Sequence, residues 1–359
     1  MTLAAHVSID LTAVKHNLDK VRQLAPAAKI LAVIKANAYG HGMVRVAEAL
    51  DGVDAVAVAR ITEGIYLRNT GCVKKIVVLE GFVDESELLN LIDSDLEFVV
   101  HSEGQVDIIE KYNGAQQISL WLKLDTGMNR LGLKAVVFSS VYQRLMLCNH
   151  IKKPLSLMTH FSSADDRNDK SVTERQLALF TETVKDYPGS KSLANSAAII
   201  DWPRSIADWV RPGLMLYGVS PFLTDSAEQL GLVPVMSFHS RLISVKVIEA
   251  GETVGYSGTW VATGKTRLGV IAIGYGDGYP RYAEIGTPVL VNGIRVPLVG
   301  RVSMDMITVD LGEMDVVPGA QVTLWGDGLP VEEIAKYSKT IPYTLLCGIT
   351  QRVKVTVVS

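Results

Sequence analysis

A repeating order of apolar strands and amphipathic helices, from about residue 29 to residue 217, restricts the possible folds of this chain more than any other feature. The strand-like runs are Lys29–Lys35, Asp54–Ala59, Lys75–Leu79, Leu96–Val100, Ser119–Leu124 and Leu155–His160. Most of them lack alternation between apolar and polar residues, which is typical of parallel strands covered on both faces. The order favours an α/β fold, a (β/α)8 barrel of the TIM type. An open doubly wound sheet stays possible, because a repeat along the chain does not show closure.

The pattern changes near Pro234, where closely spaced strand-like runs replace the alternation. These runs are Arg241–Ile248, Arg267–Ile273, Pro288–Val291, Arg295–Val299, Met306–Asp310 and Val353–Val358. The segment Val291-Asn-Gly-Ile294 is a strong hairpin signal, and one helix is expected at Val331–Ser338. The sequence therefore predicts two domains, a barrel over residues 1–234 and a mostly β domain over residues 235–359.

Composition excludes several classes of function. The 35 lysines and arginines against 38 aspartates and glutamates give a formal net charge of −3, which is not the basic surface of a nucleic-acid binder. Mean hydropathy is +0.22, yet no uncharged stretch reaches the roughly 18 apolar residues of a membrane-spanning helix. The seven histidines show no metal-ligand spacing, so no metal is expected.

The expected location follows from the N-terminus and the cysteines. Met1–His6 shows no signal-peptide pattern. Cys72, Cys148 and Cys347 lie far apart and outside any CxxC motif, so we interpret them as small buried residues in a reducing compartment. We expect a cytoplasmic protein with neither nucleic acid nor membrane as a partner.

The strand Lys29–Lys35 ends in Lys35-Ala-Asn-Ala-Tyr-Gly-His-Gly42. A lysine that closes a barrel strand lies at the C-terminal mouth, where the active sites of this architecture lie. It could equally be a lysine that extends into solvent at a strand end. A desolvated lysine can lose its proton and form a Schiff base with a carbonyl cofactor. The nearby Tyr39 and the glycines offer a hydroxyl and a close backbone approach to a bound anion.

This segment resembles the pyridoxal-phosphate attachment segment of the alanine racemase family, bacterial biosynthetic type. Further similar segments extend over almost the whole chain, at Trp121–Gly132, Trp209–Gly218, Gly255–Trp260, Gly274–Arg281 and Gly300–Met306. The resemblance implies an isomerase that interconverts L-alanine and D-alanine and supplies D-alanine for the peptidoglycan of the cell wall. It also implies pyridoxal 5′-phosphate, held as an internal aldimine on Lys35.

The resemblance implies two bases as well. Racemisation needs an acid or base on each face of the planar carbanion, since a single base returns the proton to the side it left. By resemblance, Lys35 serves the D-alanine face and Tyr256 the L-alanine face, with cationic neighbours that stabilise the Tyr256 phenolate. Because the two residues lie in different predicted domains, the resemblance implies a head-to-tail homodimer in which each subunit completes the other's site.

Other residues take cofactor roles by resemblance. The cofactor phosphate is expected at Tyr39, Ser196, Gly213 and Leu214, the pyridine nitrogen at Arg211, and the cofactor ring beside His160. Alone, Arg211 could equally be a structural ion-pair partner, and His160 a core histidine. A further tyrosine of the family aligns with Gln351, so that phosphate contact is not expected here.

The substrate pocket is expected to include Arg130 and Met304, with Asp305 and Tyr275 at its entrance. Period-two geometry places Lys123 on the same face of its strand as Asp125, with Arg130 shortly after. The resemblance implies a carbamylated Lys123, whose negative charge orients Arg130.

Alternative functions differ at specific residues. Another barrel-type amino-acid racemase or decarboxylase with the same cofactor is the nearest alternative, but the decarboxylases place a carboxylate rather than Arg211 near the ring nitrogen. A non-catalytic pyridoxal-phosphate carrier is the alternative from another class, and it needs neither Tyr256 nor the β domain.

Overall fold

The computed structural model describes residues 5–222 and 224–358, and their contacts divide the chain into two compact units. The barrel unit comprises Leu18–Ala38 and Gly42–Leu216. The sheet unit comprises Met1–Asn17, Tyr39–His41 and Tyr217–Ser359. Of the N-terminal segment assessed above for a signal peptide, residues 1–4 lie outside the described residues.

Within residues 5–222, eight parallel strands close into a barrel in chain order. They are β2 (Lys29–Val33), β3 (Ala55–Val58), β4 (Lys75–Val78), β5 (Glu97–Val100), β6 (Leu120–Lys123), β7 (Ser156–Met158), β8 (Lys191–Ser192) and β9 (Trp209–Val210). Because β2 pairs with both β3 and β9, the barrel is closed, and the predicted (β/α)8 fold is confirmed over the open sheet. All of β3 is buried, as expected of a strand covered on both faces.

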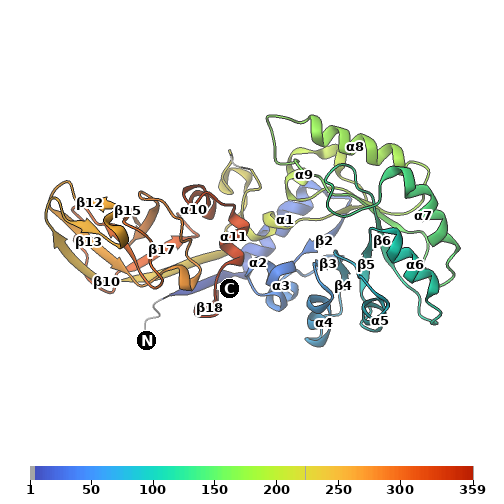
Figure 1. Cartoon of the computed structure of the whole chain (residues 1–359), viewed down its shortest axis with the longest axis horizontal. Coiled ribbons are helices and arrows are strands. Elements are labelled where there is room, and N and C mark those ends of the chain that lie inside the picture. The colour runs from blue at the N-terminus through green and yellow to red at the C-terminus, as the bar shows by residue number, and fades with distance from the viewer. Residues whose placement is uncertain (1–4, 223, 359) are drawn as a thin grey trace. The chain divides into compact units, whose positions relative to one another are not determined.

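Helices form an outer layer around these strands (Figure 1). They are α3 (Met43–Ala49), α4 (Ile61–Asn69), α5 (Glu85–Asp93), α6 (Glu103–Lys111), α7 (Ala135–Leu147), α8 (Ser171–Val184) and α9 (Ser196–Asp201), with the 3-10 turns η1 (Pro203–Ser205) and η2 (Leu214–Tyr217). Side-chain caps start α5 and α6, where Asp84 and Ser102 accept hydrogen bonds from backbone N–H groups three residues later. None of the described helices is long and apolar enough to cross a bilayer.

The sheet unit contains a sheet that has eight strands among the described residues, ordered β13-β16-β15-β14-β17-β10-β1-β18. They are β1 (His6–Asp10), β10 (Met236–Ile248), β13 (Thr266–Ile271), β14 (Pro288–Val291), β15 (Ile294–Val299), β16 (Ile307–Asp310), β17 (Gln321–Trp325) and β18 (Lys354–Val358). A short ribbon pairs β11 (Thr253–Val254) with β12 (Trp260–Val261). The predicted hairpin joins β14 to β15, and Asn292 and Gly293 have φ of 48° and 80°, as its tight turn requires.

The first strand belongs to this sheet rather than to the barrel. β1 pairs antiparallel with β10 and parallel with β18, and α1 (Leu11–Leu24) follows it, capped by Asp10. The sequence pattern assigns residues 1–234 to the barrel domain, whereas the barrel strands run only from Lys29 to Val210. The alternating burial of β1 is a pattern that many different sheets could accommodate. The strands that it pairs with, β10 and β18, lie far along the chain.

The predicted helix of the sheet unit is present as α10 (Val331–Tyr337). Two further elements of this unit were not predicted, the helix α11 (Pro342–Cys347), which starts at a proline, and the strand β17. Its 3-10 turns are η3 (Glu228–Leu230), η4 (Tyr256–Gly258) and η5 (Tyr275–Asp277). The prediction of buried cysteines is wrong, because Cys347 is exposed and the other two are half-buried.

Candidate active site

Strand β2 leads through Ile34 into Lys35 and a left-handed turn, labelled α2 (Lys35–Tyr39). Ala36, Asn37 and Ala38 have φ of 52° to 55° and ψ of 45° to 52°, and Tyr39 has φ of 52°. Each L-residue in this region costs roughly 1–2 kcal/mol, so the turn persists only where contacts enforce it. Sequence analysis missed the turn, because alanine favours right-handed helices.

Hydrogen bonds hold the turn from both sides. The Ala38 N–H donates to Ile34 O at 2.8 Å, and the Met43 N–H donates to Asn37 Oδ1 at 2.9 Å. The Ala36 N–H donates to Glu63 Oε1 at 2.7 Å. The other oxygen of Glu63 accepts a hydrogen bond from the Ala59 N–H at 2.8 Å, beyond the end of the neighbouring strand β3. Glu63 therefore ties the segment that follows Lys35 to the rest of the barrel mouth.

The mouth of the barrel collects positive charge. The charges of Lys35, Arg130 and Arg211 all act on Lys123, which closes β6. Burial, reinforced by these cations, lowers the pKa of Lys123 to about 8. The lowered pKa leaves more of this amine neutral near physiological pH than is usual for a lysine. Lys123 is therefore unusually ready to react as a free amine.

Arg211 is 5% exposed and lies directly after β9. Its guanidinium donates to Ser192 Oγ at 2.7 Å, to Thr159 O at 2.5 Å and to Leu193 O at 3.2 Å. It also lies 3.3 Å from His160 Nδ1. Burial lowers the pKa of Arg211 to about 10, which still leaves it cationic at neutral pH. These partners are all uncharged, so this part of the mouth attracts an electron-rich or anionic ligand.

His160 lies just beyond β7, and its Nδ1 is 3.3 Å from Arg211 Nη2. Burial holds the pKa of His160 well below its usual value, and the nearby cations Arg211, Lys123, Arg130 and Lys35 lower it further. The imidazole is therefore neutral, and its Nδ1 is placed to accept a hydrogen bond from the guanidinium. A neutral flat ring beside a fixed cation suits contact with an aromatic ligand.

The loop after β6 carries Arg130 and is shaped by Asp125. Oδ1 of Asp125 accepts hydrogen bonds from the N–H groups of Gly127 and Asn129, each at 3.0 Å, and Oδ2 lies 2.6 Å from Lys134 Nζ. These bonds lower the pKa of Asp125 despite its burial. The Asp125 carboxylate is thus occupied by hydrogen bonds within the loop. The exposed side chain of Arg130 is available to a ligand.

The predicted phosphate residues of the barrel unit gather at the start of α9. Ser196 Oγ accepts hydrogen bonds from the N–H groups of Gly213 at 2.9 Å and Met215 at 3.3 Å. Leu214, which begins η2, lies between these two residues in the chain and is buried. A serine hydroxyl with neighbouring backbone N–H groups at a helix start is a suitable cradle for a phosphate.

Tyr39 belongs by its contacts to the sheet unit. Its ring lies 4.7 Å from the ring of Tyr217 and 5.6 Å from that of Tyr343, between centroids. Burial, followed by the influence of Tyr343, raises the pKa of Tyr39, so its hydroxyl stays protonated and can donate to an anion. Gln351, where the sequence comparison looked for a further tyrosine, is exposed in a turn. The ring of Tyr343, a residue that sequence reasoning missed, lies beside that of Tyr39.

Tyr256 and Met304 lie on adjacent loops of the sheet unit. Tyr256 begins η4 and follows Gly255, which has a φ of 73°. A Cβ added to Gly255 would lie 3.3 Å from the backbone nitrogen of Arg301. Arg301 Nη1 reaches Ser257 Oγ at 3.4 Å, which brings a cation to the turn of Tyr256. Tyr256 is 68% exposed and Met304 is 52% exposed. Both side chains are thus more than half open to solvent among the described residues.

The expected entrance residues Tyr275 and Asp305 also belong to the sheet unit. The Tyr275 N–H donates to Ser303 O at 3.1 Å, so the turn η5 lies against the Met304 loop. Asp305 is half-exposed and accepts a hydrogen bond from Arg352. These neighbours join the predicted substrate residues of this unit into one surface.

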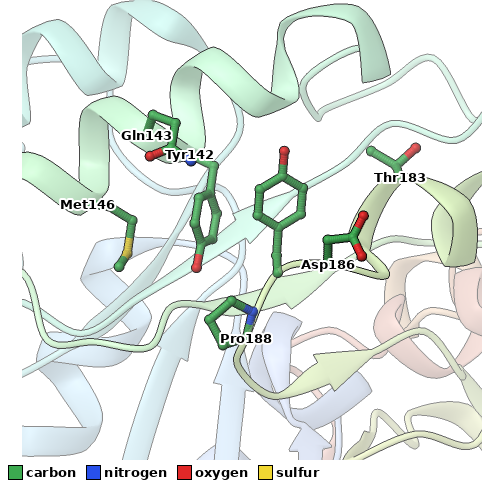
Figure 2. Close-up of a pocket in the computed structure, with 7 residues that line it drawn as sticks. Tyr142, Gln143, Met146, Thr183, Asp186 and Pro188 are labelled. Atoms are coloured by element: carbon green, nitrogen blue, oxygen red, sulfur yellow. The ribbon is translucent and has the colours of Figure 1, made fainter.

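A separate pocket of about 430 Å³ lies on the outside of the barrel. Figure 2 shows it between Tyr142 and Met146 of α7 and Thr183 of α8, with Asp186 and Pro188 after α8. These helix ends lead into the starts of strands, at the opposite end from the predicted site. None of the predicted site residues lines this pocket. No three metal-ligating side chains gather within residues 5–222 and 224–358.

Both halves of the chain match known family models. Residues 9–221 match a model described as "Alanine racemase, N-terminal domain", and residues 235–357 match "Alanine racemase, C-terminal domain". A curated relative from Shewanella sediminis, named alanine racemase, is 49% identical over 349 residues, 97% of each chain. Another from Vibrio cholerae, of the same name, is 49% identical over 98% of this chain and 97% of its own.

Solved structures give the same result. The biosynthetic alanine racemase of Pseudomonas aeruginosa aligns with a TM-score of 0.96 and 40% identity, over the full length of both chains. The alanine racemase of Acinetobacter baumannii aligns with a TM-score of 0.94 and 38% identity, over 99% of this chain and 100% of its own. The structural alignments and the sequence matches therefore both relate this chain to alanine racemases over nearly its whole length.

Proposed function

Because this chain belongs to the alanine racemase family and is an isomerase that interconverts L-alanine and D-alanine, we propose that Lys35 and Tyr256 are its two bases. Lys35 removes or returns the Cα proton on the D-alanine face, and Tyr256 does so on the L-alanine face. The observation that carries the proposal is the position of Lys35 at the mouth, next to a strained turn and among cations. Strain of this kind concentrates at functional sites.

Pyridoxal 5′-phosphate is the proposed cofactor, and it fits the residues present. Lys35 would bind its carbonyl carbon, Arg211 would face its ring nitrogen, and His160 would lie beside its ring. Ser196, Gly213, Leu214 and Tyr39 would hold the phosphate. When bound, the cofactor withdraws electrons from Cα and acidifies its hydrogen. The uncharged partners of Arg211 and the positive mouth of the barrel support this assignment.

Arg211 limits the reaction to proton transfer. A guanidinium has no acceptor and stays protonated, so it would keep a ring nitrogen that it faced unprotonated. A nitrogen without a proton withdraws electrons less strongly, which disfavours side reactions such as transamination. This position of an arginine also argues against the decarboxylase alternative, for which a carboxylate is expected.

Arg130 and Met304 form the proposed substrate pocket, with Asp305 and Tyr275 at its entrance. We propose that the neutral amine of Lys123 attacks CO2, forms an N–C bond and loses a proton, leaving a carbamate. The resulting negative charge offsets the cations around it and orients Arg130. In 13C-labelled bicarbonate, the wild type should show a carbamate resonance that Lys123→Met lacks. Lys134→Met is the matched control and should keep it.

A head-to-tail homodimer is the proposed assembly. Large apolar side chains are exposed on the sheet unit at Tyr256, Tyr275, Tyr282, Ile285, Met304, Met306, Ile341 and Tyr343. Of these, Tyr275, Met304 and Met306 lie on loops that contact each other, since the Tyr275 N–H donates to Ser303 O, and a contiguous apolar patch of this kind marks an interaction surface. A second copy that covers them brings its own Lys35 to the Tyr256 and Met304 loops. Each site is then built from the barrel unit of one subunit and the sheet unit of the other.

Mixed dimers test the shared site. Lys35→Ala and Tyr256→Phe are each expected to be nearly inactive alone. After co-expression, random pairing makes half of the dimers mixed, and each mixed dimer has one intact site of two. Activity should then return to about a quarter of the wild-type value. Mixed dimers without activity, isolated by two affinity tags, contradict the shared site.

The cellular role proposed is the supply of D-alanine for peptidoglycan, in the cytoplasm. Expression in a bacterium that requires added D-alanine should allow growth without it. Growth that still depends on D-alanine, from cells that contain active enzyme, argues for a catabolic role instead.

A further inference from the structure

Arg352 joins two loops of the predicted substrate surface. It lies in the segment between α11 and β18, and sequence reasoning assigned it no role. Its Nη2 donates to Asp305 Oδ1 at 2.8 Å, and its Nε lies 3.4 Å from Asp277 Oδ1. We call these three side chains the Arg352 bridge. Asp305 belongs to the Met304 loop, and Asp277 ends η5, which contains Tyr275.

Backbone contacts align the same loops. The Gly276 N–H donates to Met304 O at 2.9 Å, so the two loops already touch at the predicted substrate residue. Thr350, two residues before Arg352, donates from Oγ1 to Gly276 O at 2.9 Å. The three segments thus contact one another, and the Arg352 guanidinium forms ion pairs with one carboxylate from each of the two loops.

Gly276 is part of this arrangement. A Cβ built at Gly276 would collide with Arg352 Nη1 and would come 3.0 Å from Met304 O. Its φ lies outside the left-handed region, so backbone conformation does not explain the glycine. The absence of a side chain makes room for the guanidinium against the η5 backbone.

Asp277 is well suited to transmit this link. It is buried, and its Oδ2 accepts a hydrogen bond from the Gly274 N–H at 3.0 Å, which closes η5. The second oxygen is left for Arg352. A charged hydrogen bond to Asp305 on one side and a buried carboxylate on the other fix the guanidinium plane. Lysine cannot reproduce this geometry, because its ammonium is a single point charge.

We infer that Arg352 is a positioning residue for alanine binding: the Arg352 bridge fixes the Met304 loop against η5, so that Met304 meets the substrate in one orientation. The inference rests on the proposed place of Met304 in the substrate pocket. Since the bridge acts on binding rather than on proton transfer, its loss should change KM more than kcat.

The first experiment measures kinetics in the intact holoenzyme. Arg352→Ala should raise KM for both alanine enantiomers about tenfold and change kcat less than about threefold. Arg352→Lys should fall between this variant and the wild type. Gly276→Ala should reproduce the effect of Arg352→Ala, because it displaces the guanidinium without removing it. The control is Arg295→Ala, which breaks an equally exposed pair with Glu333 of 2.7 Å elsewhere on the sheet unit.

The second experiment measures amide hydrogen exchange, which does not depend on activity. Peptides that cover residues 274–280 and 301–307 should exchange about tenfold faster in Arg352→Ala and Gly276→Ala, and at the wild-type rate in Arg295→Ala. An unchanged KM in a folded, racemising Arg352→Ala overturns the inference. A loss of kcat alone, or unchanged exchange in both loops, also overturns it. If the wild type itself does not racemise alanine, the proposed function fails, while the exchange experiment still tests the bridge.

Discussion

The barrel unit and the sheet unit present their predicted site residues differently. In the barrel unit, Arg211 and His160 lie at strand ends, where partners fix them and burial shifts their pKa values. In the sheet unit, Tyr256 and Met304 lie on loops and are more than half exposed. The charged groups of the barrel unit are therefore already held in place by their partners. Tyr256 and Met304 of the sheet unit would be surrounded only after another molecule covers them. The predictions below test this division.

The largest expected effect is at Lys35. Lys35→Ala should lower kcat by at least about 10³-fold, because it removes both the cofactor link and one base. Lys29 starts the same strand and lies over the ring of Trp209, 5.4 Å from its centroid. Lys29→Ala should keep kcat within about twofold and cost stability of only about 0.5–1 kcal/mol. Racemisation rates in both directions measure kcat, and thermal melting measures the stability of each variant. Equal losses of kcat contradict a special role for the mouth of the barrel.

Tyr256→Phe should lower racemisation by about 10²-fold or more, because it removes the base of the L-alanine face. In deuterium oxide, this variant should still exchange the Cα proton of D-alanine through Lys35, without inverting it. The measurement is proton NMR of the recovered alanine, with chiral chromatography. Equal loss of exchange from both enantiomers argues that Tyr256 is only structural.

Arg211→Gln should lower racemisation on the order of tenfold, which corresponds to about 1.4 kcal/mol of barrier. It should also form pyruvate from alanine, because the ring nitrogen is then no longer kept unprotonated. A coupled pyruvate assay detects this side reaction. Arg267→Gln serves as the control from the sheet unit, where the guanidinium donates to Val316 O at 3.0 Å. Absence of pyruvate in the Arg211 variant contradicts the proposed role in reaction specificity.

The last expected effect concerns the free energy of unfolding at mildly acidic pH rather than racemisation. His160 has a pKa well below 6.5 in the folded protein, so below pH 6.5 the unfolded chain binds a proton that the folded chain does not. Its contribution is therefore complete above pH 6.5 and is lost as the pH falls, by up to about 1.4 kcal/mol per pH unit. Denaturant unfolding of the wild type and of His160→Gln at pH 7, 6 and 5 measures it. Parallel pH dependences contradict the low pKa.

Local patterns were enough to predict six of the eight barrel strands, because burial on both faces requires continuous apolar runs such as Ala55–Val58. The strands β8 and β9 have two residues each and are too short to show such a run. The paired strand ends then placed Lys35, Lys123, His160 and Arg211 together. The place of β1 was not predictable in this way, since a five-residue alternating strand fits many sheets. Closure of the barrel was equally invisible until the pairing of β2 with β9 was known.

Contacts made by distant segments account for the other differences. Tyr343 lies in α11, and only the fold brings it to Tyr39. Arg352 acquires its two carboxylates in the same way. The turn Ala36–Tyr39 runs against the local preference of its residues and depends on Glu63 and on the bonds of Asn37. Motifs indicate which side chains matter, whereas long-range packing decides how they are held.

The turn after Lys35 has a stereochemical consequence. Its backbone is the mirror image of an ordinary helical turn, and two of its residues, Ala36 and Ala38, are alanines. For D-amino acids this region of conformational space is the relaxed one, since reflection exchanges the favoured and disfavoured hands. A chain assembled chemically with D-alanine at positions 36 and 38 would thus relieve the strain at two of the four left-handed residues, whereas Asn37 and Tyr39 would keep theirs. An enzyme that makes D-alanine holds two L-alanines in the shape that its own product prefers.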